Sequence, residues 1–105
     1  MPVARLSGFA AAGFAAAGLA AAGFAAAGVA AGLKSSGAFD VALVVNDGPR
    51  HDAAVVLTTN RVQAAPVLWT RQVAGDGRLD AVVLNSGGAN ACTGPDGFGD
   101  THRTA

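Results

Sequence analysis

The sequence contains no glutamate, isoleucine or tyrosine, and it has a single cysteine. One cysteine cannot form an internal disulfide or supply a cysteine-rich metal site, so the composition indicates a reducing, cytosolic setting. Seven basic residues balance seven acidic ones, and the formal net charge is zero. Because no basic stripe runs along the chain, the sequence gives no support for nucleic-acid binding.

The apolar content is high but consists largely of small side chains. Hydrophobic residues make up 51% of the 105 positions, and alanine is the commonest of them. Alanine buries little area per residue, so the core available to this chain is small.

A five-residue repeat fills the stretch 8–33, where a large apolar residue follows each glycine at positions 8, 13, 18, 23 and 28. On a helix, a five-residue step turns each large side chain by roughly 140°, so no apolar stripe forms. On a strand the same side chains would alternate between faces. We therefore interpret residues 1–33 as a low-complexity segment, and residues 34–105 as the start of a folded domain.

The repeat is also long and uncharged enough to raise two further alternatives. Its 26 residues between Arg5 and Lys34 could cross a bilayer, although alanine and glycine are only weakly apolar. A secretory signal is the other alternative, but the apolar region is overlong and has no single obvious cleavage site.

Beyond Lys34 the sequence has the patterns of an α/β domain. Buried strands are predicted at 39–45 and 53–59, close enough to pair as a hairpin, and a further strand at 79–85. Pro66 predicts a helix start, and glycines at 75 and 77 end that helix after about two turns. The fold class predicted is α/β, in the sense of an α+β layered sandwich with three or four strands and one or two helices.

A second helix is predicted in the sequence PDGFGDTHRTA, with Thr93 or Asp96 as its N-cap. It reaches Ala105 without a glycine C-cap, and the elements together bury little area. We expect the chain to be a truncated, N-terminal piece of a larger protein.

The most distinctive stretch is the loop LNSGGANACTG at 84–94, between the last strand and this helix. Glycine-rich turns before a helix can hold a phosphate, but no nucleotide motif is present and no lysine lies within reach in sequence. The residue types favour a tight turn instead. Its candidate site-bordering residues are Asn85, Ser86, Gly87, Gly88 and Asn90.

The remaining reactive side chains give weaker patterns. Cys92 with His102 and Asp100 could form a triad, but working triads usually draw their members from separate elements. His51, His102 and Cys92 have no recurring metal-ligand spacing. We therefore assign no catalytic residue and no metal ligand.

Four stretches together resemble a known family: AAGVAAGLK, DVALVVNDGP, TTNRVQAAPVLWTRQV and AVVLNSGGANACTGPDGF. In this order and spacing, over residues 24–105, they resemble the N-terminal part of the bifunctional ornithine acetyltransferase/glutamate N-acetyltransferase of arginine biosynthesis. Gly88 stands where many members carry asparagine, which is a mild departure. The upstream repeat units look like an expansion of one family segment, which weakens the membrane and signal alternatives.

The resemblance implies a cytoplasmic enzyme that cuts itself at an Ala-Thr bond and uses the freed threonine as its nucleophile. That threonine would carry acetyl from N-acetylornithine to glutamate, with acetyl-CoA as a further donor in some members and no cofactor. It also implies a β chain made by the self-cleavage, an α2β2 assembly, and no nucleic-acid or membrane partner. The nucleophile and the oxyanion-hole Thr-Gly pair would lie beyond Ala105, so this chain alone should be inactive. The alternative is a small phosphate- or CoA-binding module that uses the loop 85–94.

Overall fold

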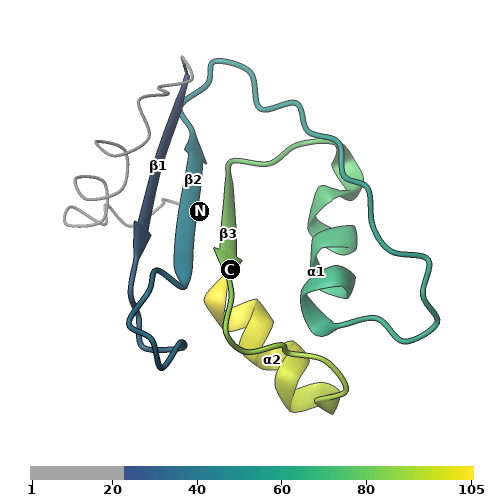
Figure 1. The fold of residues 1–105 in the computed structure, drawn as a ribbon. Coiled ribbons are helices and arrows are strands. Elements are labelled where there is room, and N and C mark those ends of the chain that lie inside the picture. The colour runs from purple at the N-terminus through teal and green to yellow at the C-terminus, as the bar shows by residue number, and fades with distance from the viewer. Residues whose placement is uncertain (1–22) are drawn as a thin grey trace. The chain divides into compact units, whose positions relative to one another are not determined.

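The computed structural model describes residues 23–105, and the first three units of the repeat lie outside these described residues. They form three strands and two α-helices, an α+β arrangement that confirms the predicted fold class (Figure 1). The described chain divides into two compact units. The first contains residues 23–49 and 80–87, and the second contains residues 50–79 and 88–105.

The first unit is an antiparallel sheet in the order β1-β2-β3. β1 is Phe24–Val29, β2 is Val41–Asn46 and β3 is Ala81–Asn85. Phe24 lies opposite Asn46, and Val41 lies opposite Asn85. The two predicted strands at 39–45 and 79–85 are therefore present, shifted by one or two residues at their ends.

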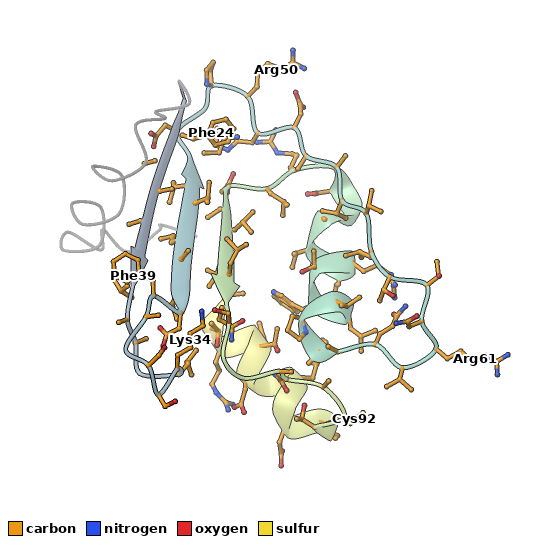
Figure 2. The ribbon with its side chains drawn as sticks, in the orientation of Figure 1. Phe24, Lys34, Phe39, Arg50, Arg61 and Cys92 are labelled. Carbon is orange, nitrogen blue, oxygen red and sulfur yellow. The ribbon has the colours of Figure 1, made fainter. Side chains whose placement is uncertain are left out.

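The strand β1 is the element that the sequence did not predict. Its composition, FAAAGV, has low strand propensity, and its repeat lacks a two-residue period. Pairing with β2 supplies the hydrogen bonds, and small side chains let neighbours approach closely: the Phe39 ring lies against Gly28 (Figure 2). Tertiary pairing thus overrides local preference in this part of the repeat.

The predicted strand at 53–59 was wrong. This stretch contains no strand, and Val56 is fully exposed at 101%. The only bridge nearby pairs Asp52 with Arg78. The expected hairpin with β2 is excluded because β1 and β3 already occupy both edges of β2.

The second unit is built on two helices. α1 is Ala65–Val73, with Pro66 in its first turn, as predicted. A 3₁₀ turn, Ala74–Asp76, follows it, and Gly77 ends that turn with a φ of 73°. α2 is Gly94–Thr104 and begins after Thr93, one of the two predicted N-cap positions. Trp69 of α1 packs against two rings of α2, edge-on to Phe98 and against His102 with centroids 4.5 Å apart.

None of the helices within residues 23–105 is long and apolar enough to cross a bilayer. The repeat upstream of Gly23, on which the membrane and signal alternatives depended, lies outside the described residues.

The turn from β1 to β2 is held by a buried carboxylate. Asp40 is only 3% exposed, and its carboxylate accepts hydrogen bonds from the N–H groups of Ala31, Leu33 and Lys34 at 2.6, 2.6 and 3.0 Å. The bond from Ala31 is the largest cause that holds the pKa of Asp40 below its ordinary value of 3.8, against the opposing effect of burial. The ionised side chain is therefore the form that the fold selects.

We predict that Asp40→Asn destabilises the sheet, since an amide offers one acceptor oxygen and turns N–H groups toward the other donors. Because the folded pKa is lowered, this stabilisation is present above pH 3.8 and is lost as pH falls through the folded pKa. Urea unfolding of the purified chain, followed by circular dichroism from pH 7 downward, should show a difference between wild type and variant that shrinks toward acid. Asp47→Asn, at an exposed carboxyl of the same unit, is the matched control. A difference that stays constant with pH would contradict the assignment.

Candidate functional site

The predicted site-bordering loop runs from Asn85 to Gly94, and the division between the two units falls inside it, after Gly87. Asn85 is the last residue of β3, and its side chain is exposed. The N–H of Ser86 donates to the carbonyl of Asp40 at 2.8 Å, which continues the β2–β3 ladder by one more pair. The first part of the loop is therefore an extension of the sheet.

Gly87 is required by its surroundings. Its φ is 100°, a conformation that side-chain-bearing residues rarely adopt, and a Cβ there would lie 2.8 Å from the Cγ of Lys34 and 3.2 Å from the backbone of Leu33. Gly88 has open space around the same position and no positive φ. Of the two predicted turn glycines, only Gly87 is held by both backbone conformation and close contact.

The close approach at Gly87 also places a lysine, Lys34, beside the loop. The sequence analysis expected no lysine there, because none is near the loop in the sequence. Lys34 lies near the C-terminal end of β3 (Figure 2), because the pairing of the strands places the β1–β2 turn beside Gly87. Its ammonium donates to the carbonyl of Phe39 at 3.1 Å. This charge therefore already has a main-chain partner.

In the second unit, Asn90 connects the loop to both helices. Its side-chain amide donates to the carbonyl of Gly97 at 2.6 Å and to the hydroxyl of Thr101 at 2.9 Å, and its amide oxygen accepts from the hydroxyl of Thr93. Its backbone carbonyl accepts from the N–H of Ala65 at the start of α1, at 3.1 Å. Both amide hydrogens of Asn90 are used, which makes it a positioning residue.

Gly97 is a residue that the sequence analysis missed. It is buried in α2, and a Cβ at this position would overlap the Thr93 side chain and the amide oxygen of Asn90. The absence of a side chain lets the loop lie directly on the helix. The only signal in the sequence is a glycine inside a helical segment, which usually has a packing reason. We call Asn90, Thr93, Gly97 and Thr101 the loop clasp.

The loop clasp also explains why Thr93, the N-cap residue of α2, makes no side-chain bond to the helix. Its hydroxyl makes no cap bond to the helix N–H groups. It donates to Asn90 instead, while its carbonyl accepts the first helical bond from Gly97. The position of the N-cap was predicted correctly, but the side chain works for the loop rather than the helix.

An open, largely apolar hollow lies beside the start of α2. It has a volume of about 350 Å³ and is lined by Gln63, Ala65, Leu68, Cys92, Thr93, Gly94, Pro95 and Phe98. Gln63 lines the hollow with an amide side chain that already has hydrogen-bond partners. It donates to the carbonyl of Thr58 at 2.9 Å and accepts from Arg71 at 2.7 Å. The hollow therefore suits an apolar group better than a charged one.

The geometry does not support the triad or the metal site that the sequence analysis considered. Asp100 forms an ion pair with Arg103, and the ring of His102 lies against Trp69, so neither is arranged around the exposed Cys92 as a triad requires. Nowhere between residues 23 and 105 do three histidine, cysteine or acidic side chains come together as metal ligands.

Comparison with known proteins identifies the framework to which this loop belongs. The model of the ArgJ family matches residues 25–105, which includes β2, β3, both helices and all of β1 except Phe24. The chain belongs to the ArgJ family. This confirms the resemblance predicted from the sequence, and the match begins within the fourth repeat unit, in β1.

Curated ArgJ relatives are close in sequence but much longer. The arginine biosynthesis bifunctional protein ArgJ of Mycobacterium tuberculosis is 71% identical over 74 residues, which is 70% of this chain and 18% of that protein. The ArgJ of Streptomyces coelicolor is 69% identical over 74 residues, covering 70% and 19%. The chain thus spans about a fifth of the length of these relatives.

Solved structures support the same conclusion. The ornithine acetyltransferase of M. tuberculosis, in complex with ornithine, aligns with a TM-score of 0.79 and 70% identity over 81% of this chain and 44% of that one. The ArgJ of Bacillus halodurans aligns with a TM-score of 0.73 and 40% identity, over 79% and 43%.

For the ArgJ loop we predict that Gly87→Ala destabilises the sheet by about 1–2 kcal/mol or more, from the positive φ and the contact with Lys34. Gly88→Ala, one residue on, should change stability by less than about 0.5 kcal/mol. Urea unfolding of the purified chain, followed by the sheet amide signals in NMR spectra, measures both. Equal effects of the two substitutions would mean that the crowding at Gly87 is not real.

A second prediction concerns the loop clasp. Asn90→Ala should cost about 1–3 kcal/mol, because it leaves the Gly97 carbonyl and the Thr101 hydroxyl without their donor. The fluorescence of Trp69, the single tryptophan, reports on the packing of α1 against α2 and should show unfolding at lower urea. Asn60→Ala, at an exposed asparagine of the same unit, is the control. If both variants unfold at the wild-type urea concentration, Asn90 does not hold the loop.

Proposed function

We propose that this chain is the front segment of the α chain of an acetyltransferase of arginine biosynthesis, which transfers acetyl from N-acetylornithine to glutamate. The observation that carries the proposal is the family match over residues 25–105, together with 71% identity to an arginine biosynthesis protein. The complex of a solved relative with ornithine supports the substrate class.

The proposed chemistry proceeds through an acetyl-threonine intermediate. A threonine freed by self-cleavage attacks the acetyl carbonyl of N-acetylornithine, and ornithine leaves as the free amine. The amine of glutamate then attacks the acetyl ester, which releases N-acetylglutamate and regenerates the hydroxyl. Donors placed at the developing oxyanion lower both barriers. We place the nucleophile and these donors outside this chain, which alone is inactive.

The described residues contribute structure to this reaction rather than reacting groups. Asp40 fixes the β1–β2 turn, Gly87 lets the loop pass Lys34, and Asn90 fastens the loop to α2. These interactions set the path of the loop 85–94 from its two ends. We propose that the loop borders the acyl site of the complete enzyme and that Asn85, Ser86 and Gly88, which are exposed, are its outward-facing members.

The partners follow from the same proposal. The chain pairs with a β chain released from the same precursor, in an α2β2 assembly, and works in the cytoplasm on small-molecule substrates. Acetyl-CoA is a further acetyl donor if the complete enzyme also initiates the pathway. The alternative of an independent phosphate- or CoA-binding module stays a prediction. The bond that Lys34 donates to the carbonyl of Phe39 does not favour it, because the ammonium next to the loop already has a partner.

Growth of a bacterium that lacks ornithine acetyltransferase and requires arginine tests the proposal. In a chimera, the 74 matched residues of the M. tuberculosis ArgJ are replaced by those of this chain. We expect the chimera to restore growth without arginine, and the 105-residue chain alone to give none.

The intact M. tuberculosis ArgJ is the positive control, and ArgJ lacking the 74 residues is the negative one. A chimera that accumulates as folded protein but does not restore growth would contradict the proposed function. Growth supported by the chain alone would contradict the placement of the nucleophile outside it.

A further inference from the structure

The strand β1 is one copy of a sequence that occurs several times in the chain. It lies in GFAAAGV at 23–29, and residues 13–19 read GFAAAGL, which differs only at the last position. Residues 8–14 read GFAAAGF and residues 18–24 read GLAAAGF. Three further segments therefore match at least five of the seven residues at 23–29.

The place that β1 occupies beside β2 requires small side chains at its centre. Ala27 lies opposite Leu43 and is 8% exposed, and a Cβ on Gly28 would already touch the Phe39 ring at 3.4 Å. At the start of the strand the requirement is looser, because Phe24 is 49% exposed. All three further segments have alanine and glycine at the positions of Ala27 and Gly28, and phenylalanine or leucine at that of Phe24. Each of them meets the requirements of this place.

The pairing of β1 with β2 does not choose between these segments. The bonds between the strands join main-chain groups, which every repeat unit supplies. Register is weakly specified in glycine-rich strands, and a shift by a whole unit returns the same residue types to the same faces of the sheet. β1 also lies at an edge, with only β2 as a neighbour in the described sheet (Figure 1), so it can leave without breaking any other strand pairing.

The turn after β1 does choose, and it does so through one glycine. Gly32 has a φ of 90°, and a Cβ there would meet no other atom within 4 Å, so only the backbone conformation requires glycine. The repeat places Gly32 four residues after Gly28 instead of five. After a shift of one, two or three units, the same place would hold Ala27, Ala22 or Ala17. The register of the structure is therefore preferred through the cost of one alanine at positive φ.

The other parts of this turn discriminate weakly. Asp40 accepts from the N–H groups of Ala31, Leu33 and Lys34, which are main-chain donors that any residue except proline provides. A shift adds five residues per unit to the turn, and the entropy lost on closing a loop grows only slowly with its length. The upstream segments are thus close competitors of residues 24–29.

We propose that the upstream repeat units exchange with residues 24–29 of the same chain for the place of β1 beside β2. The best-matched competitor is the segment 14–19, in which Leu19 takes the place of Val29 opposite Val41. Because every unit offers an acceptable strand, the number of units can change without loss of the sheet. The proposal concerns the fold of this chain and does not depend on the reaction catalysed.

A charge at the buried alanine of β1 tests this exchange in the full chain. Ala27→Asp places an unpaired carboxylate opposite Leu43, so the register of the structure is lost and an upstream unit should supply the strand. A fourfold variant that adds Ala12→Asp, Ala17→Asp and Ala22→Asp, at the equivalent positions, has no acceptable unit left. Urea unfolding, followed by the amide signals of β2 in NMR spectra, compares the two. The unfolding equilibrium constant of the fourfold variant should be about tenfold or more above that of Ala27→Asp.

The matched control carries the three upstream aspartates and keeps Ala27, and it should unfold near the wild-type urea concentration. Equal unfolding of Ala27→Asp and the fourfold variant would overturn the proposal. A control that unfolds as early as the fourfold variant would also overturn it, because the added charges alone would then account for the loss. So would stability of Ala27→Asp that falls on dilution of the protein, since the strand would then come from a second copy.

Gly32→Ala gives a second readout that adds no charge. It places alanine at the positive φ in every register, so it should raise the ratio of shifted to unshifted strand by about fivefold or more. A second set of amide signals at Val41, with a nuclear Overhauser contact to Leu19 in place of Val29, should report the shifted strand. Adding the three upstream aspartates should remove this set. A single set of signals in Gly32→Ala, with contacts from Val29 alone, would contradict the exchange.

Discussion

The carboxylate of Asp40 is the interaction on which the rest of the first unit depends. Three N–H groups of the β1–β2 turn bond to it, and its own backbone carbonyl accepts from Ser86 at the end of β3. One residue thus fixes where β1 turns back and where β3 ends. A turn of small and polar residues has little apolar area with which to hold itself, so charge-assisted bonds to the backbone replace packing there.

The same principle recurs at the other end of the loop. Asn90 holds main-chain and hydroxyl groups of α2, and the missing side chain of Gly97 allows that contact. Because alanines form the buried apolar core of the described residues, specific polar bonds carry much of the definition of this loop. Side chains that hydrogen-bond to the backbone in this way have their donors and acceptors occupied. The most distinctive motif of the sequence is therefore a scaffold. In the family to which the chain belongs, we propose that the scaffold supports a site whose reacting groups lie on other residues.

The sequence predicted the elements whose signals are local. Pro66 and Gly77 marked the limits of the first helical region, and apolar runs marked β2 and β3. Strand pairing was not predictable, because it depends on which segments compete for the edges of β2. The alanine-rich β1 pairs with β2, and the valine-rich 53–59 stretch forms no strand. Within the loop, glycines and asparagines signalled a turn, but the crowding at Gly87 and the role of Gly97 arise from neighbours distant in sequence. Motif resemblance gave the family, which no composition argument could supply.

We propose that this segment positions an acyl-transfer site without supplying its nucleophile. The most direct test is to locate the acetyl group in the M. tuberculosis chimera, after incubation with N-acetylornithine that carries a heavy-isotope acetyl and no acceptor. Acid quenching, digestion and mass spectrometry then identify the labelled residue. We expect the label on a threonine outside the segment supplied by this chain. Label on Cys92, Ser86 or any other side chain of the segment would contradict it.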